Sequence, residues 1–238
     1  MEINEYFIIL KKGKFKENDL WLKVLSPNLG FNTYFAFGGL KSRRRFCGCL
    51  DIFNLLYGKI SQNKRSHYFT LQEAYLVNKF ANLKDYPNKI GVIYNVTSFL
   101  EKIKITPDEY QKIFNLFVDF LSILPDVSNI SYLPLLFKAN LIFNLGYLPL
   151  FSKCLVCNKA LGAERVFFSI KEGGFYCSSC VKFKQFTFAM SYRHVLFLQY
   201  IANSKPKDWI NVKLALELRQ MCYKIVSIFS EYHLAVSL

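Results

Sequence analysis

Four cysteines stand in two pairs of the form Cys-x-x-Cys, Cys154 with Cys157 and Cys177 with Cys180, and 19 residues separate the pairs. Two residues between thiolates allow both sulfurs of a pair to reach one metal ion, and two such pairs complete a tetrahedral shell. We therefore predict one bound zinc ion. It would be structural, because four thiolates leave no open position for water or substrate. The alternatives are four unrelated buried thiols or two redox pairs, but the βαβ pattern that accompanies a redox pair is not evident.

The basic composition is the second feature that bears on function. The chain of 238 residues has a formal net charge of +14, and residues 1–80 contain 13 Lys and Arg against 6 Asp and Glu. A basic excess of this size favours polyanionic partners, nucleic acid first and an acidic membrane surface second. The alternative is a soluble protein from a lysine-rich proteome, in which the charge indicates no particular partner.

The basic residues of this region gather in two clusters. One is Lys41-Ser42-Arg43-Arg44-Arg45, after the flexible Gly38-Gly39 pair, and the other is Lys11, Lys12, Lys14 and Lys16. Guanidinium groups form forked hydrogen bonds to phosphates, and each neutralised phosphate releases counterions, so the cluster at residues 41–45 predicts salt-sensitive phosphate contacts. A solvated turn is the alternative. Bases could stack on the nearby aromatic residues, which include Tyr34, Phe35 and Phe37. Their alternation is more typical of a barrel core, so no stacking role is assigned to them.

Catalytic patterns are not evident in the sequence. Gly39-Leu40-Lys41-Ser42 is not a P-loop, because leucine precedes the lysine and the upstream glycine would fall on Phe35. The histidines, His67, His194 and His233, are scattered and lie outside the cysteine module. The sequence contains no paired carboxylates and no Cys-His arrangement whose spacing is more specific than chance would give. The sequence therefore gives no positive evidence for an enzyme.

The first 80 residues have the pattern of short β-strands. Runs of aromatic and branched residues are separated by turn signals such as Lys12-Gly13-Lys14 and Ser26-Pro27-Asn28. Five short strands in this length predict a small barrel, and a five-stranded OB-fold is the natural candidate. The predicted strands are 6–10, 20–25, 31–37, 46–57 and 68–77.

Beyond about residue 79 the pattern becomes helical. Thr106 is suited to cap a helix, with Pro107 at its first position and Glu109 closing a capping box. Gly146 is suited to end another helix. The predicted helices are 110–124, 130–145, 192–202 and 212–232. The predicted class is α+β, with a nucleic-acid-binding OB-fold over 1–80 and a helical domain over 81–238 that contains an inserted zinc module at about 150–185.

Targeting signals are not evident either. Residues 1–5 are acidic and lack the apolar run of a signal peptide. The longest apolar stretch, 132–151, is interrupted by a lysine, two asparagines and two prolines, so it is unsuited to crossing a bilayer. An odd total of 7 cysteines fits a reducing compartment. We expect a cytoplasmic protein associated with the nucleoid.

The order of these parts resembles the RecO family of bacterial recombination mediators. Residues 8–19 are similar to the family's opening strand and acidic turn, and residues 30–42 to the strand before its Gly- and Arg-rich loop. Residues 141–148, with Gly146-Tyr147, and then 154–157 resemble the family's Leu-Gly-Tyr stretch before the first cysteine pair, and residues 168–177 resemble its approach to the second. The resemblance covers nearly the whole chain. The basic loop is short, where many relatives carry a longer Arg- and Pro-rich segment.

The resemblance implies a DNA-binding mediator in DNA repair that makes and breaks no bond. It would bind single- and double-stranded DNA, anneal complementary strands and, with RecR, help load RecA onto DNA coated by the single-strand-binding protein SSB. The acidic, apolar-ended tail of SSB would bind a cleft rimmed by lysines, for which the candidates are Lys102, Lys104, Lys112 and Lys138. The residues that match the family's DNA-binding pattern are Lys11, Lys12, Lys41, Arg43, Arg44 and Arg45, and the four paired cysteines match its zinc site.

Other classes of function stay open at this point. Composition alone equally permits an RNA-binding OB and zinc protein without annealing activity. A nucleic-acid-processing enzyme with an unrecognised site would require activity that depends on a divalent metal. A peripheral membrane protein is disfavoured, since no long basic amphipathic helix stands apart from the predicted core.

Overall fold

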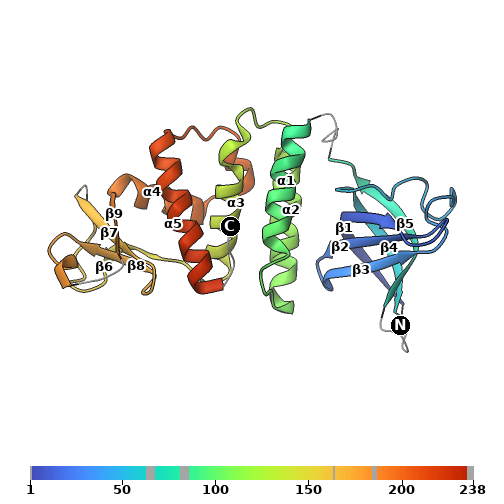
Figure 1. Cartoon of the computed structure of the whole chain (residues 1–238), viewed down its shortest axis with the longest axis horizontal. Helices are drawn as coiled ribbons and strands as arrows, with labels where there is room; N and C mark the ends of the chain where they lie inside the picture. The colour runs from blue at the N-terminus through green and yellow to red at the C-terminus, as the bar shows by residue number, and fades with distance from the viewer. Residues whose placement is uncertain (1, 63–67, 81–85, 163, 184–186, 235–238) are drawn as a thin grey trace. The chain divides into compact units, whose positions relative to one another are not determined.

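The computed structural model describes residues 2–62, 68–80, 86–162, 164–183 and 187–234 (Figure 1). The chain divides into two compact units, of which the first contains residues 1–90 and 105–125 and the second contains residues 91–104 and 126–238. Strands build the N-terminal part and helices most of the C-terminal part, which confirms the α+β class. The domain division between residues 80 and 81 stays a prediction.

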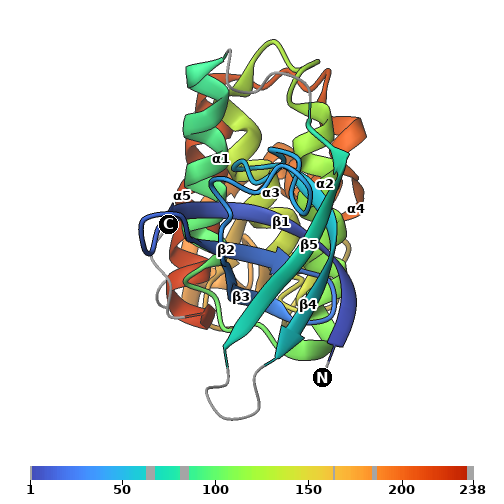
Figure 2. The same cartoon turned by 90° about the vertical axis from the view of Figure 1, so that its right-hand side faces the viewer.

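A closed barrel of five strands forms the core of the first unit (Figure 2). The strand order is β1-β2-β3-β5-β4, with β3 and β5 parallel and the other neighbours antiparallel. This order confirms the predicted OB-fold. Alternation along the strands buries Phe7, Leu22 and Tyr34 in the barrel core. The strands are β1 Glu2–Lys14, β2 Leu20–Ser26, β3 Gly30–Ala36, β4 Leu55–Gln62 and β5 Phe69–Asn78.

The fourth strand differs from the prediction. Residues 46–57 have the composition of a strand, but β4 spans Leu55–Gln62. Residues 46–54 instead form a turning segment, which the N–H of Phe53 anchors through a hydrogen bond to the carbonyl of Ile9 at 2.6 Å. The side chains that this segment buries in the barrel core are those of Phe46, Cys49 and Leu50. Core filling by a loop, and not strand pairing, accounts for its apolar composition.

Helix α2, Tyr110–Ile123, packs against β2 and β3 of the barrel. It follows a short turn in which the N–H of Thr106 donates to the Glu109 carboxylate at 3.0 Å, as the capping box predicts. The ring of Tyr110 lies so close to Gly30 that an added Cβ would come within 2.5 Å of it. Gly30 also has a φ of +64°, which favours glycine. The close approach of Tyr110 to Gly30 places α2 against the start of β3.

Helices around a central α3 form the bulk of the second unit. Helix α3, Leu133–Asn144, is apolar on nearly all sides and contacts α4, Tyr192–Asn203, and α5, Leu216–Leu234. The buried Asn140 amide on α3 donates to the carbonyls of Ile201 and Ser204, at 2.7 and 3.0 Å, which satisfies the C-terminal end of α4. Helix α1, Pro87–Leu100, begins in the first unit and continues into the second.

The predicted helices agree with these bounds except at two starts. Helix α3 begins at Leu133 and not at residue 130, because Ile130–Tyr132 form a 3₁₀ turn. Gly146, with a φ of +95°, follows α3 as predicted. Helix α5 begins at Leu216 and not at residue 212. Within the described residues, no helix combines the length and the apolar character that a membrane crossing requires.

A small sheet is inserted between α3 and α4, where the zinc module is predicted. Its strand order is β6-β8-β7-β9. The ring of Phe168 lies 5.8 Å from that of Phe229 on α5, and Nε2 of His233 lies 2.8 Å from the carbonyl oxygen of Ile170. These contacts join the sheet to the helices of its own unit. The strands are β6 Leu150–Cys154, β7 Arg165–Ser169, β8 Gly174–Cys177 and β9 Thr187–Ser191.

Candidate functional site

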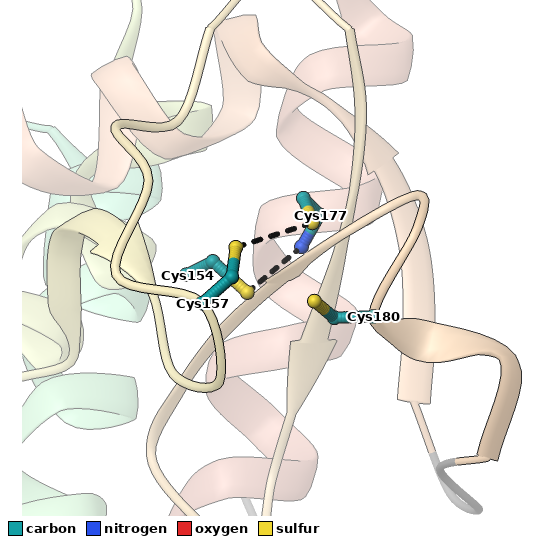
Figure 3. A group of neighbouring side chains, drawn as sticks. All are labelled: Cys154, Cys157, Cys177 and Cys180. Atoms are coloured by element: carbon teal, nitrogen blue, oxygen red, sulfur yellow. Dashed lines mark hydrogen bonds between the residues drawn. The ribbon is translucent and has the colours of Figure 1, made fainter.

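The four paired cysteines converge on one point beside the small sheet (Figure 3). Cys154 ends β6, Cys177 ends β8, and the second cysteine of each pair follows in a turn. All four Sγ atoms lie within 4.8 Å of one another, and those of Cys157 and Cys177 are 3.8 Å apart. Zinc at about 2.3 Å from each of four tetrahedral sulfurs places those sulfurs about 3.8 Å apart. The cluster therefore fits zinc binding.

Backbone hydrogen bonds favour the thiolate of Cys154. Its Sγ is buried and accepts from the N–H groups of Val156, at 3.5 Å, and Cys177, at 3.4 Å. Burial raises the pKa of this thiol, but the hydrogen bonds outweigh burial and lower the pKa to about 6. The hydrogen bond with Cys177 raises the pKa of the Cys180 thiol to about 12. Cysteine binds a metal as the thiolate, and a bound divalent cation would favour that form of its ligands.

Other potential metal ligands do not join this cluster. In the part of the chain that the structure describes, no second group of Cys, His, Asp and Glu side chains converges in the same way. Nδ1 of His194 lies 2.8 Å from the hydroxyl of Ser191, at the start of α4, as expected for a residue at a helix start. His67 lies outside the described residues.

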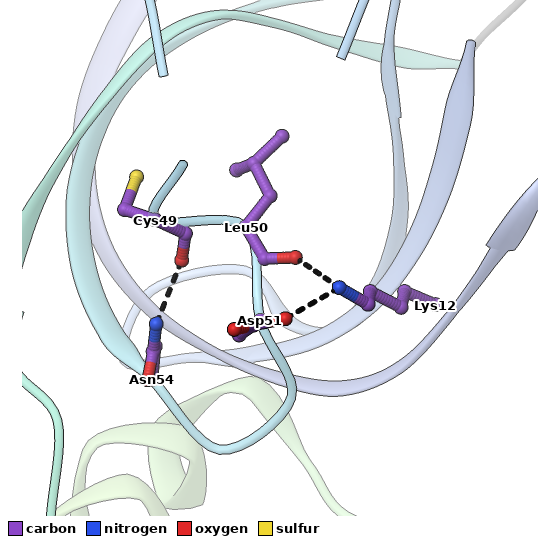
Figure 4. A network of polar contacts seen from close by, with 5 residues as sticks. All are labelled: Lys12, Cys49, Leu50, Asp51 and Asn54. Carbon is purple, nitrogen blue, oxygen red and sulfur yellow. Dashed lines mark hydrogen bonds and ion pairs between the residues drawn. The ribbon is translucent and has the colours of Figure 1, made fainter. Parts of the chain in front are cut away.

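The first basic cluster lies on the β1–β2 hairpin of the barrel. Lys11, Lys14 and Lys16 are exposed there. Lys12 differs, because its Nζ donates to the carbonyl of Leu50 at 2.8 Å and pairs with the carboxylate of Asp51 at 2.6 Å (Figure 4). Its charge therefore holds the turning segment 46–54 against β1.

The second basic cluster lies in the loop between β3 and β4. Lys41, Arg43 and Arg44 are exposed, and their side chains make no hydrogen bond or ion pair with another described residue. Arg45 differs, because its guanidinium donates to the carbonyl of Phe37 and lies over the ring of Phe46, 5.0 Å from its centroid. Arg45 thus supports the loop, while the other three side chains are open to a ligand.

Backbone contacts bring the two clusters together. The N–H of Leu40 donates to the carbonyl of Asn18 at 3.1 Å, and the N–H of Gly38 donates to the carboxylate of Asp19 at 2.7 Å. The β1–β2 hairpin and the loop after β3 therefore lie side by side. We call the exposed side chains of the two clusters the basic rim, and they are Lys11, Lys14, Lys16, Lys41, Arg43 and Arg44.

The different environments of Arg44 and Arg45 predict different effects on stability. We expect Arg45→Ala to lower the free energy of unfolding of the barrel by about 1–2 kcal/mol, because a charged hydrogen bond and a cation–π contact are lost. Arg44→Ala, the matched control, should change it by less than about 0.5 kcal/mol. Urea denaturation followed by circular dichroism measures both values, and equal values would contradict the supporting role of Arg45.

The aromatic residues considered for base stacking have different exposures. Tyr34 is fully buried in the barrel core, and its neighbours Phe35 and Phe37 are half-buried. Two further rings, Phe15 in the β1–β2 hairpin and Tyr68 beside β5, are exposed but were not singled out from the sequence. Phe15 could have been found because lysines flank it on both sides in a polar turn, where a core residue is not expected.

A cavity of about 450 Å³ in the second unit is lined by residues of α1 and α3 and by the exposed Lys102. Lys138 on its wall is 2% exposed, and its Nζ lies 5.3 Å from the ring centroid of Phe99. Burial, and next the charge of Lys102, lower the pKa of Lys138 to about 8. Two of the four candidate lysines for a tail-binding cleft are thus brought together, whereas Lys112 lies on α2 in the first unit.

Comparisons with known proteins point to one family. The family model described as Recombination protein O N terminal matches residues 1–80, and the one described as Recombination protein O C terminal matches residues 87–238. A DNA repair protein RecO of Maridesulfovibrio salexigens is 36% identical over 99% of this chain and 96% of its own length. The DNA repair proteins RecO of Lawsonia intracellularis and Nitratidesulfovibrio vulgaris are each 32% identical over 100% of this chain and 96% of their own length.

Proposed function

This chain belongs to the RecO family of DNA repair and recombination proteins, and from that premise we propose that it is a mediator that binds DNA and anneals complementary strands. With RecR it would help load RecA onto single-stranded DNA coated by SSB, at the nucleoid in the cytoplasm. No covalent bond is made or broken in this work. The observation that carries the proposal is the basic rim on a closed barrel.

Charge neutralisation is the physical basis of the proposed annealing. Two complementary strands repel each other through their phosphates, and a protein that neutralises phosphates on both strands lowers that repulsion. Lys41, Arg43 and Arg44 are suited to this task, because their charges are not engaged with other described residues. Lys11 belongs to the same rim, whereas Lys12 and Arg45 are engaged inside the barrel unit and would support it.

Zinc would have a structural role in this proposal. Cys154, Cys157, Cys177 and Cys180 would hold one Zn²⁺ with no open position, so the ion takes no part in a reaction. Bound there, it would tie the end of β6 to the end of β8. The sheet that presents these ligands contacts α5, so the ion would also stabilise the helical part of its unit.

The tail of SSB would bind at the cavity lined by Lys102 and Lys138. An acidic peptide end brings carboxylates, and the cavity offers one exposed and one buried ammonium group. Tyr94 and Phe99 supply apolar wall beside the two lysines, which suits the apolar end of such a tail. The cavity therefore offers the mixture of charge and apolar surface that this ligand requires.

Strand annealing tests the proposed function directly. We expect wild type to anneal complementary oligonucleotides coated by SSB, and Lys41→Ala/Arg43→Ala/Arg44→Ala to lose most of that activity. Removing three phosphate contacts should flatten the slope of log K against log salt for single strands by about 2 and weaken binding by about tenfold or more. Gel-based annealing and fluorescence anisotropy over a salt series measure the two effects.

A matched charge control separates a surface effect from a general loss of basic charge. Lys205→Ala/Lys207→Ala/Lys213→Ala removes three exposed cations from the second unit and should leave annealing and the salt slope unchanged. Equal losses in both triple variants would contradict a DNA surface at the basic rim. Equal affinity for RNA with no annealing by wild type would favour the RNA-binding alternative.

A further inference from the structure

A chain of three touching aromatic rings lies on the outside of the barrel. The ring of Phe35 on β3 makes edge contacts with Phe15, at 5.0 Å between centroids, and with Tyr68, at 5.5 Å. Phe15 is 49% exposed and Tyr68 is 36% exposed. Large apolar rings in this state contribute little to a core, and side by side on the surface they form an apolar patch that a ligand can cover.

The strand register shows why these rings are outside. Trp21 on β2 pairs with Phe35 on β3, and both alternate with inward residues of the barrel core. Farther along β2, Leu25 also faces outward, but it is fully buried near the end where α2 packs. The helix therefore covers one end of the β2–β3 face and leaves the aromatic end open.

Trp21 lies at this open end of the β2–β3 face, beside Phe35 in the strand register. Its ring lies against Gly13 in the neighbouring strand β1, where an added Cβ would come within 2.5 Å of the indole nitrogen. A glycine at this position lets the large ring lie close to the sheet. We call Phe15, Trp21, Phe35 and Tyr68 the aromatic strip.

Two lysines flank the Phe15 end of the aromatic strip. Nζ of Lys16 lies 5.7 Å from the ring centroid of Phe15, and Lys14 precedes the same ring. The hairpin that carries Phe15 is joined to the basic loop by the hydrogen bond from Leu40 to Asn18. Apolar rings beside exposed cations match a ligand that has flat apolar faces and a negatively charged backbone, which describes an unpaired nucleic-acid strand.

We propose that the aromatic strip stacks unpaired bases, so that the chain distinguishes single-stranded from double-stranded DNA by stacking and not by charge. This inference rests on the proposed DNA-binding function and adds to it the residues that sense the absence of pairing. Bases of a duplex are already stacked on each other and offer no free face, so duplex binding uses the basic rim alone. A single strand uses both surfaces.

The experiment compares the variant Phe15→Ala/Tyr68→Ala with wild type on three probes: a 20-nucleotide single strand, the same strand with abasic sites throughout, and a 20-base-pair duplex. Stacking is worth about 1–3 kcal/mol per base, so two lost rings should weaken binding to the normal single strand by about 30-fold or more. Affinity for the duplex and for the abasic strand should stay within about twofold, because no phosphate contact is removed.

A second aromatic pair on the barrel provides the matched control. Tyr6 and Tyr57 face each other on β1 and β4 with centroids 4.8 Å apart, and they are 47% and 38% exposed. Tyr6→Ala/Tyr57→Ala removes the same amount of exposed ring away from the aromatic strip and should change no affinity. Thermal melting of both variants shows whether each is folded.

The outcomes separate the two proposals. If wild type binds none of the three probes, the proposed function fails. If wild type binds DNA and Phe15→Ala/Tyr68→Ala binds all probes equally well, the aromatic strip has no role and this inference is overturned while the function stands. Equal losses on the single strand and the duplex would overturn it too, because they indicate damage to the basic rim and not lost stacking.

Discussion

Cys154→Ser is expected to release the metal from the protein and to unfold the small sheet of the second unit. Cys154 is the one fully buried member of the cluster, and its sulfur accepts backbone hydrogen bonds from Val156, in the turn that carries Cys157, and from Cys177 at the end of β8. Structural zinc contributes about 10–16 kcal/mol of binding free energy in zinc-finger peptides. That is as large as the whole stability of a typical domain, about 5–15 kcal/mol, so a unit without its zinc should not keep this sheet.

The damage should stay inside the second unit. The sheet contacts α5 through Phe168 and through Ile170, so losing it exposes apolar surface of that helix. The barrel has a core of its own, built from residues of the five strands and the 46–54 segment. We therefore expect calorimetry to show a lost or lowered transition for the second unit and a largely unchanged one for the barrel, with residual DNA binding.

Buried and exposed cysteines outside the cluster provide the controls. Cys222→Ala removes a buried thiol of α5, and Cys47→Ala removes an exposed one of the barrel unit. Both should keep one zinc per chain by elemental analysis. Wild type purified without metal yet fully stable, or Cys154→Ser with unchanged metal content, would contradict a structural zinc site.

The sequence predicts local features well. Two cysteines with two residues between them can be recognised as metal ligands without any structure, because the spacing itself brings both sulfurs to one ion. The capping residues before α2 and Gly146 after α3 are equally local, and both are confirmed. Alternation in the first 80 residues was enough to predict a five-stranded barrel.

What the sequence could not show depends on contacts between distant segments. Phe46 and Leu50 look like strand residues, and their place inside the barrel is evident only once the strands have closed around them. Lys12 and Arg45 look like their neighbours in the basic clusters, but Asp51 and Phe37 engage them. The division of the two basic clusters into supporting and exposed cations is therefore a property of the tertiary structure.

Lys138→Met is expected to make the second unit more stable. A lysine that is 2% exposed is charged at an energetic penalty, which lowers its pKa to about 8 from an ordinary value near 10.5. Methionine has a similar length and carries no charge, so the substitution should raise the free energy of unfolding at pH 7 by roughly 1–3 kcal/mol. Denaturation by urea at pH 7 measures the change.

The pH dependence identifies the cause of this gain. Between pH 8 and 10.5 the unfolded chain binds a proton at Lys138 that the folded chain has lost, so the stability of wild type rises with pH across this window. The penalty is fully present below pH 8 and disappears as the unfolded lysine also loses its proton. The advantage of Lys138→Met should therefore shrink toward pH 10.5, and an advantage independent of pH would show that better packing, and not charge, is responsible.

A residue that weakens its own unit is expected to have a compensating use, and the proposed tail-binding cavity supplies one. Lys138→Met should weaken the binding of an acidic SSB tail peptide by about tenfold, as expected for one lost charged hydrogen bond. Lys102→Met, at the exposed side of the same cavity, should also weaken the peptide but change stability little. Isothermal titration of both variants separates the two effects. If Lys138→Met gains stability and binds the peptide as wild type does, the buried charge has another role and the cavity is not the tail site.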